Sequence, residues 1–176
     1  MRSRASAGFA GIAVALLLPQ LAPASQRGTR QAAPRLEGPW TISLVYTVAE
    51  GLQDRRVGQK VTERWVVRPR CKSGPCAVDL QRAGRRLLLC RSGSTYRGTG
   101  SFTGAFFCNG QTYSTGTTYV ESWTVRVRRS GPGARGRRAL AIAGVGATVG
   151  RSGGDLPCAP VVSRERVEFS GVTVRP

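Results

Sequence analysis

The fold is decided by the stretch Trp40-Thr41-Ile42-Ser43-Leu44-Val45-Tyr46-Thr47-Val48, in which every second side chain is large and apolar. Small or hydroxylated residues fill most of the positions between them. A period of two places alternate side chains on opposite faces of a strand, so the stretch predicts a β-strand with one buried face.

The same alternation returns along the rest of the chain, and clusters of glycine, serine and proline separate the stretches that carry it. The further stretches are 61–67, 77–80, 87–90, 119–127, 139–145 and 161–174. Helical spacing of apolar residues does not persist for two turns anywhere, whereas β-branched and aromatic residues dominate each stretch. We therefore expect an all-β protein of seven or eight strands.

The connections between these strands are short, which favours antiparallel neighbours. An open sheet would leave two unpaired edges, so we expect an antiparallel meander that forms a closed or nearly closed β-barrel of about eight strands. A two-sheet β-sandwich is the alternative architecture. The barrel interior would be lined by Trp40, Ile42, Leu44, Trp65, Val67, Trp123 and Val125.

The N-terminal residues 1–24 have the pattern of a secretory signal peptide. Two arginines precede an apolar run at 7–18, and Ala22-Pro23-Ala24 supplies the small residues that cleavage requires. The run is shorter than the ~20 residues that span a bilayer. We expect a secreted, extracellular protein without stable membrane insertion after cleavage, with a flexible linker at 25–37 and a single β domain at 38–176.

The composition is strongly basic, with 27 Lys plus Arg against 9 Asp plus Glu and a formal net charge of +18. There is no histidine, which removes the commonest general base and the commonest neutral metal ligand. We expect neither a metal nor a cofactor. The charge favours attraction to anionic polymers, and the alternative is that the arginines reflect a GC-rich coding bias.

The chain contains an odd number of cysteines for an oxidising compartment: Cys71, Cys76, Cys90, Cys108 and Cys158. The sequence alone leaves their pairing open. The turn Ser73-Gly74-Pro75 can reverse the chain, which favours a bridge between the two cysteines that flank it. We predict Cys71–Cys76 and Cys108–Cys158 disulfides, with Cys90 as a buried free thiol beside the leucines at 87–89.

The start of the first strand, Gly38-Pro39-Trp40, resembles the G-x-W signature of calycin-type barrels, the lipocalin and avidin-like proteins. That resemblance implies that Trp40 plugs one end of the barrel and that an arginine near the C-terminus stacks on it. Arg164, Arg166 and Arg175 are the candidates for that arginine.

A broader resemblance extends over most of the chain after the proposed cleavage point. It rests on Trp65-Val66-Val67-Arg68-Pro69, on the C-x4-C turn Cys71–Cys76, on Tyr96-Arg97-Gly98-Thr99 and on a later cysteine. These features resemble small secreted actinobacterial β proteins that are mostly uncharacterised. The resemblance implies export and a β fold.

Our leading functional expectation is a non-enzymatic barrel with a binding or surface-interaction role, in which a packed interior is the alternative to a cavity. The candidate cavity residues are Trp40, Leu44, Trp65, Glu121 and Trp123. Glu121 shares the phase of the large residues, so we expect it to point inward and to pair with an arginine. A glycan-directed hydrolase that uses Glu121 is a further alternative, with Glu63 as the comparable second carboxylate.

Residues 126–138 contain six arginines and no acidic residue. Their glycines and proline predict a long, mobile hairpin tip. The candidate contacts for an anionic cell-wall or extracellular polymer are Arg126, Arg128, Arg129, Arg135, Arg137 and Arg138. No aromatic residue is interleaved with them, so base stacking is not indicated, and a solvated loop without a partner is the alternative.

Overall fold

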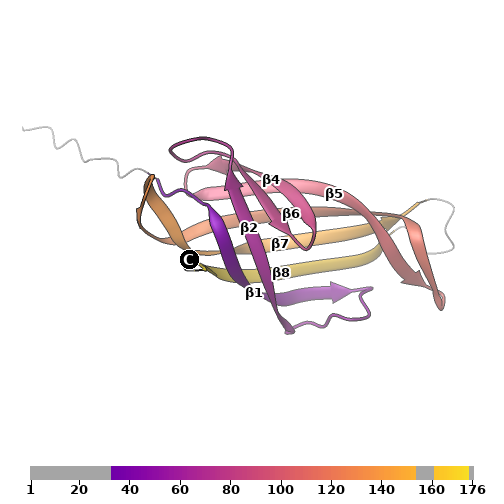
Figure 1. Cartoon of the computed structure of the whole chain (residues 1–176). Helices are drawn as coiled ribbons and strands as arrows, with labels where there is room; N and C mark the ends of the chain where they lie inside the picture. Colours follow the sequence, from indigo (N-terminus) through magenta and orange to yellow (C-terminus); the bar gives the residue numbers. More distant parts are fainter. Residues whose placement is uncertain (1–32, 154–160, 175–176) are drawn as a thin grey trace, which may run out of the picture. The chain divides into compact units, whose positions relative to one another are not determined.

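A computed structural model describes residues 33–153 and 161–174, and its helix-free architecture confirms the expected all-β class (Figure 1). Each strand pairs antiparallel with the next, and the last pairs with the first, so the meander closes into a barrel-like ring. The strands are β1 (Gly38–Glu50), β2 (Lys60–Pro69), β3 (Val78–Arg82), β4 (Arg85–Ser92), β5 (Thr95–Cys108), β6 (Gln111–Gly133), β7 (Gly136–Ser152) and β8 (Val161–Thr173). Within these ranges no helix is long and apolar enough to cross a membrane.

The alternation seen in the sequence builds the core. All seven residues expected in the interior are buried. They pack against one another: the rings of Trp65 and Trp123 meet edge to face with centroids 5.2 Å apart, and Phe169 lies 4.9 Å from Trp65. This half of the barrel is therefore filled by its own side chains.

The strands differ greatly in length, and this leaves one end of the barrel open. β3 has 5 residues, whereas β6 has 23. The β3–β4 hairpin turns at Ala83-Gly84, where both residues have positive φ, while β5 continues to Cys108 (Figure 1). The far parts of the long strands consequently lack cover from β3 and β4.

The strand β5 was not expected, because its glycines interrupt the apolar alternation. Gly98 lies opposite Trp123 on β6, and Gly146 of β7 lies opposite the same tryptophan from the other side. A large indole thus sits between two residues without side chains. The glycines that hide β5 in the sequence leave room for other neighbours: a Cβ atom at Gly98 would meet Leu88 and Leu89 of β4, and one at Gly100 would meet Leu87.

The last residues of the expected linker belong to the folded barrel. Leu36 is 1% exposed in the core. Arg35 forms a parallel bridge with Arg138, and its side chain donates to the carbonyl of Cys71 at 2.8 Å. The expected signal peptide at 1–24 lies outside the described residues.

The hairpin expected at 126–138 is confirmed, but the expectation of a long tip is wrong. β6 runs to Gly133 and β7 begins at Gly136, so these residues form a hairpin with a two-residue turn. The backbone of Arg35 forms hydrogen bonds with Arg137 and Ala139. The segment around Arg35 therefore lies beside the hairpin as a third stretch of backbone. Glycine and proline therefore mark a hairpin end here and not an open loop.

The Cys71–Cys76 disulfide is confirmed. The prediction that Cys90 is buried is wrong, because Leu87 and Leu89 take the inward positions of β4 and leave Cys90 exposed on the outer face. The predicted Cys108–Cys158 bridge lies outside what the structure describes, namely the segment 154–160 and the side chain of Cys108.

The arginine expected to stack on Trp40 is not found on β8. Arg164 and Arg166 are both exposed there, and Arg164 lies 3.4 Å from Glu50 in an ion pair. Arg175 lies outside the described residues. Trp40 itself is fully buried near the start of β1, where its indole donates to the carbonyl of Glu37.

Candidate functional site

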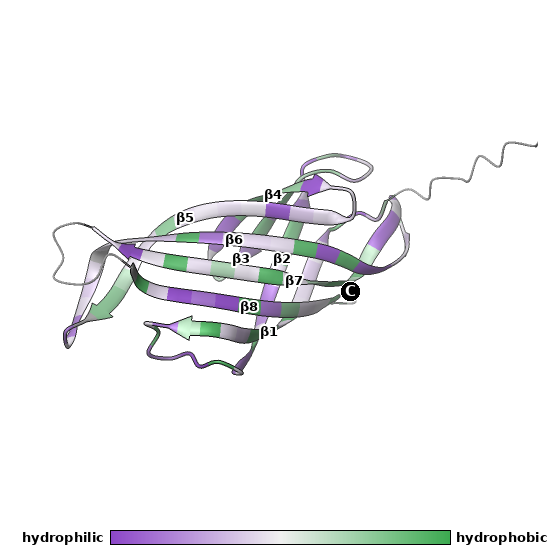
Figure 2. Cartoon of the chain, turned by 180° about the vertical axis from the view of Figure 1, so that it is seen from behind, coloured by the Kyte–Doolittle hydropathy of each residue, from purple (hydrophilic) through white to green (hydrophobic). Residues whose placement is uncertain are grey.

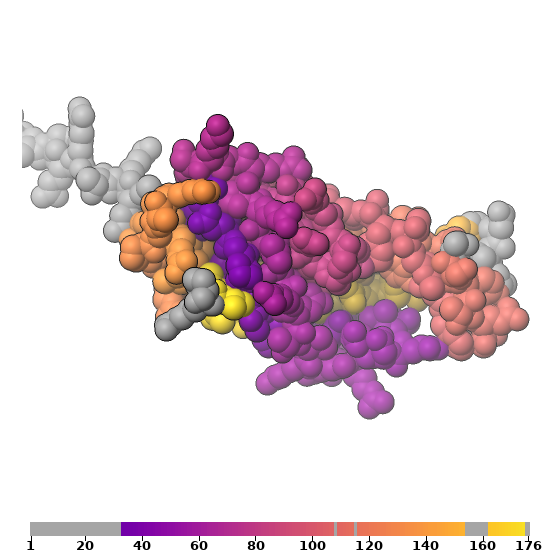
Figure 3. Space-filling model, in the orientation of Figure 1, coloured from indigo at the N-terminus to yellow at the C-terminus, as the bar shows by residue number. Residues whose placement is uncertain are grey.

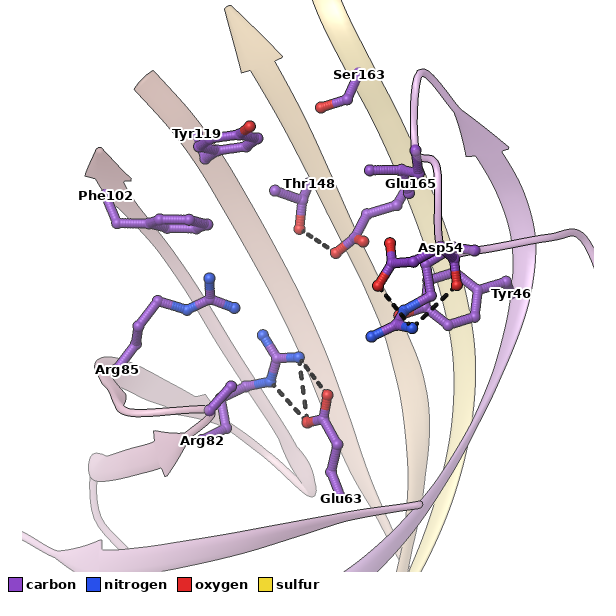
Figure 4. Close-up of a pocket in the computed structure, with 13 residues that line it drawn as sticks. Tyr46, Asp54, Glu63, Arg82, Arg85, Phe102, Tyr119, Thr148, Ser163 and Glu165 are labelled. Atoms are coloured by element: carbon purple, nitrogen blue, oxygen red, sulfur yellow. Dashed lines mark hydrogen bonds and ion pairs between the residues drawn. The ribbon is translucent and has the colours of Figure 1, made fainter. Parts of the chain in front are cut away.

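A polar cavity of about 240 Å³ lies where the β3–β4 hairpin stops short of the long strands. In Figure 3 the yellow atoms of β8 are visible in the hollow on this side of the barrel. Figure 4 shows that side chains from β2, the β3–β4 hairpin, β5, β6, β7 and β8 all reach it. The cavity is thus assembled from strands far apart in the sequence.

Beneath the cavity, the same three-residue pattern is used twice. Glu63-Arg64-Trp65 on β2 and Glu121-Ser122-Trp123 on β6 each place a glutamate and a tryptophan on the inner face. In each case the indole nitrogen donates to the carboxylate two residues earlier, at 2.8 Å on β2 and 2.9 Å on β6.

Arg82 joins these two patterns. Its guanidinium lies 3.0 Å from Glu63 and 3.0 Å from Glu121, and it sits 4.1 Å from the centroid of the Trp123 ring. The expectation that Glu121 points inward and pairs with an arginine is confirmed. Because Arg82 is satisfied by two carboxylates, it closes the top of the packed core.

Arg85 lies next to Arg82 in the cavity but is not satisfied in the same way (Figure 4). Its guanidinium stacks 3.9 Å above the ring of Phe102. Its Nε atom is buried without a hydrogen bond in the described structure, and Glu121 Oε1 lies 3.8 Å away, beyond hydrogen-bond distance. The Nε–H of Arg85 is therefore a donor without an acceptor in the described structure.

The opposite wall carries the acidic side of the cavity. Glu165 accepts a hydrogen bond of 2.8 Å from Thr148. Burial raises the pKa of Tyr46, and the negative charge of Glu165 raises it further, while the hydrogen bond from Arg55 opposes the rise. Burial and then Glu165 raise the pKa of Tyr119 as well. Glu165 thus exerts its field on phenols at two sides of the cavity.

None of the five predicted cavity residues lines the cavity. Trp40, Leu44, Trp65 and Trp123 belong to the packed core, and Glu121, 3% exposed, lies beneath Arg82. Alternation identifies inward side chains but does not show where along the barrel the packing ends.

Sequence reasoning missed Arg82, Arg85 and Glu165. One pattern pointed to Arg82: Val78 and Leu80 take the inward positions of β3, so the next inward position is an arginine. On the other side of the turn, Leu87 and Leu89 take the inward positions of β4, so Arg85 is the next inward position there.

The six arginines of 126–138 are brought together on the β6–β7 hairpin, at the other end of the barrel from the cavity (Figure 1). Arg126, Arg128, Arg129 and Arg135 are exposed, and the two others are half-buried. The arginines and the cavity are separate features of the molecule.

Among the residues that the structure describes, no group of three or more cysteine and acidic side chains could hold a metal ion. No family model matches the chain, and neither a curated protein nor a solved structure matches it. Function is therefore inferred from the chemistry of the cavity and the surface.

Proposed function

We propose that this protein is a non-enzymatic binding barrel that takes one small anionic molecule in the cavity beside Arg85. The unpartnered Nε–H donor of Arg85 carries the proposal. A buried donor without an acceptor costs about 1–3 kcal/mol, and a carboxylate or phosphate would satisfy a guanidinium through two parallel hydrogen bonds. Arg82, by contrast, needs no further acceptor.

The size and walls of the cavity narrow the class of ligand. A volume of about 240 Å³ is below the roughly 300–1,000 Å³ of pockets for drug-sized molecules, so it suits one sugar ring or one amino acid. Phe102 and Tyr119, which stack on one another with ring centroids 5.0 Å apart, add aromatic surface to the cavity wall. Glu165 disfavours a second anionic group, so the far end of the ligand should carry hydroxyl or amino groups.

The geometry favours binding over hydrolysis by Glu121. Its Oε2 atom already accepts hydrogen bonds from Arg82 and Trp123, and the side chain is 4% exposed. A carboxylate that acts on a glycosidic bond must reach the substrate. Glu121 is held below the cavity by the residues that would separate it from a ligand.

Secretion is part of the proposal. The Cys71–Cys76 disulfide supports folding in an oxidising compartment, in keeping with the signal peptide expected at 1–24. A small-molecule site on an extracellular barrel would act as a binding or carrier module.

The test uses the Nε–H resonance of Arg85 in NMR titrations with glucuronate, aspartate and inorganic phosphate, with glucose as the uncharged match for glucuronate. We expect at least one anion to shift this resonance, and glucose to leave it unchanged. Arg85→Ala should abolish binding, whereas Arg86→Ala, on the exposed outer face one residue later, should retain it. Absence of any anion effect on Arg85, or equal binding by both variants, would show the proposal to be wrong.

A further inference from the structure

The β6–β7 hairpin at residues 126–138, which we call the arginine hairpin, has no role in the cavity. It is the orange projection at one end of the space-filling view (Figure 3). Four of its arginines are exposed: Arg126, Arg128, Arg129 and Arg135. No ion pair joins any of these four to a carboxylate within the described ranges.

The arginine hairpin is fixed to the barrel. The amide of Arg35 donates to the carbonyl of Arg137, and the carbonyl of Arg35 accepts from the amide of Ala139, both at 2.8 Å. The side chain of Arg137 reaches back across the hairpin to Ser130 at 2.7 Å. The four exposed arginines are thus presented on an ordered ribbon, which reduces the entropy that binding would cost.

Acidic residues are segregated away from this hairpin. Near this end of the barrel, Glu37 and Asp79 are the described carboxylates, and each is engaged, by Arg35 at 2.6 Å and by Arg70 at 2.8 Å. The other described acidic residues lie on other parts of the barrel: Glu50, Asp54, Glu63, Glu121, Glu165 and Glu168. The positive field of the arginine hairpin is therefore not neutralised locally.

The surface chemistry of the hairpin selects among anionic partners. The large exposed apolar residues of the described structure all lie outside 126–138, so the hairpin has no apolar wedge for a membrane. It also contains no aromatic ring on which a base could stack. Guanidinium groups on a ribbon match phosphates that repeat along a flexible chain.

We infer that the arginine hairpin is a docking surface for a linear polymer that has a phosphate in each repeat and carries no bases. This inference is independent of the ligand proposed for the cavity, because the two features lie at different ends of the barrel. Figure 2 shows hydrophilic residues along this hairpin.

The test measures binding of the full-length protein to long-chain inorganic polyphosphate between about 50 and 500 mM salt. Release of counterions by four phosphate contacts predicts a slope of about −3 in a plot of log K against log salt concentration. The single variants Arg128→Ala and Arg135→Ala should each reduce the magnitude of this slope by about 0.7.

A charge-matched pair of variants separates the hairpin from net charge. The variant R126A/R128A/R129A/R135A should lose polyphosphate binding at every salt concentration. The control R56A/R64A/R151A/R166A removes the same number of exposed arginines from other surfaces and should bind within a few fold of the parent protein. Both variants should keep the far-ultraviolet circular dichroism spectrum of the parent.

Four results would overturn the inference: no polyphosphate binding at low salt, binding that is flat with salt, equal loss in the two quadruple variants, or unchanged slopes in the single variants. Tighter binding, per phosphate, to phosphatidylglycerol vesicles would instead assign the surface to a membrane. Tighter binding to single-stranded DNA would assign it to nucleic acid, and either result contradicts a phosphate polymer without bases as the partner.

Discussion

Arg82 Nη1 lies 3.0 Å from Glu121 Oε2 inside the barrel, and this ion pair marks the boundary between the packed core and the cavity. Below it, the rings of Trp65, Trp123 and Phe169 fill the interior. Above it, Arg85 lines the cavity, and its buried Nε–H has no acceptor in the described structure. The pair therefore has a structural role, and its loss should lower the free energy of unfolding.

The first prediction concerns this pair. Arg82→Met should lower the free energy of unfolding by about 3–5 kcal/mol, because it leaves buried Glu121 without its cationic partner. The double variant Arg82→Met/Glu121→Gln should recover part of that loss, and the matched change Arg64→Met on the exposed face of β2 should have little effect. Urea unfolding measures all three. A double variant no more stable than Arg82→Met would contradict an ion pair in this role.

The second prediction concerns the space around Trp123. A Cβ atom at Gly146 would overlap the six-membered ring of this tryptophan. Gly146→Ala should therefore destabilise the barrel by about 1–3 kcal/mol through overpacking. Ala147→Val, one residue along β7 and on its outer face, is the control and should be tolerated. Thermal unfolding distinguishes them, and equal midpoints would show that the indole can move aside.

The barrel could be predicted because large apolar residues alternate almost perfectly with mostly small or hydroxylated residues along β1. The sequence did not predict β5, where Gly98, Gly100 and Gly104 stand at positions that pack against large neighbouring side chains. A glycine at such a position meets the packing needs of a neighbouring strand. The residues next to it in the sequence therefore do not indicate why it is there. The hairpin at 126–138 was expected, but the length of its strands was misjudged for a related reason, because they are supported by backbone hydrogen bonds with Arg35, which lies far away in the sequence.

The candidate site was less predictable than the fold. Glu121 was correctly assigned to the interior and to an arginine partner, but that partner was not identified, because β3 and β6 are far apart in sequence. The cavity depends on where the β3–β4 hairpin ends relative to β5 and β6. Strand lengths and register set this position, and residue alternation does not report them.

The third prediction concerns the electrostatics of the cavity. Burial raises the pKa of Tyr46 and Tyr119, and Glu165 adds to both shifts, whereas burial raises the pKa of Tyr96 without a contribution from Glu165. Glu165→Gln should therefore lower the pKa of Tyr46 and of Tyr119 and leave that of Tyr96 unchanged. Titration of the tyrosine ring carbons by NMR measures each phenol. Equal pKa changes at all three tyrosines would show that Glu165 does not act selectively on Tyr46 and Tyr119.

The same shifts give a dependence of stability on pH. A phenol whose pKa is higher in the folded protein than its unfolded value of about 10 holds its proton longer when folded. Its contribution to stability is complete below pH about 10 and is lost as the pH rises through the folded pKa. We expect alkaline destabilisation to be weaker in Glu165→Gln than in the parent.

The fourth prediction concerns the disulfide and the arginine hairpin. The carbonyls of Cys71 and Gly74 both accept hydrogen bonds from the Arg35 side chain, and the Arg35 backbone bonds to the hairpin. Cys71→Ser/Cys76→Ser should cost about 2 kcal/mol, as expected for so short a loop. It should also speed hydrogen exchange at the amide of Ala139. Unchanged exchange there would show that Arg35 is held without the disulfide.

The fifth prediction concerns Cys90, which lies on the outer face of β4 opposite Arg97 of β5. Because its side chain is exposed, a thiol reagent should label Cys90 in the native protein, without denaturation. Cys90→Ser should remove that labelling and change the free energy of unfolding by less than about 0.5 kcal/mol, since the position is not in the core. Peptide mapping after native labelling identifies the modified residue.

Labelling that requires denaturation would contradict the outward orientation of Cys90 and would return it to the core beside Leu87 and Leu89. The same experiment tests the remaining pair. If Cys108 and Cys158 are bridged, denaturation of the unreduced Cys90→Ser variant should expose no thiol, because the Cys71–Cys76 disulfide holds the other two. The appearance of two thiols under those conditions would show that Cys108 and Cys158 are both reduced.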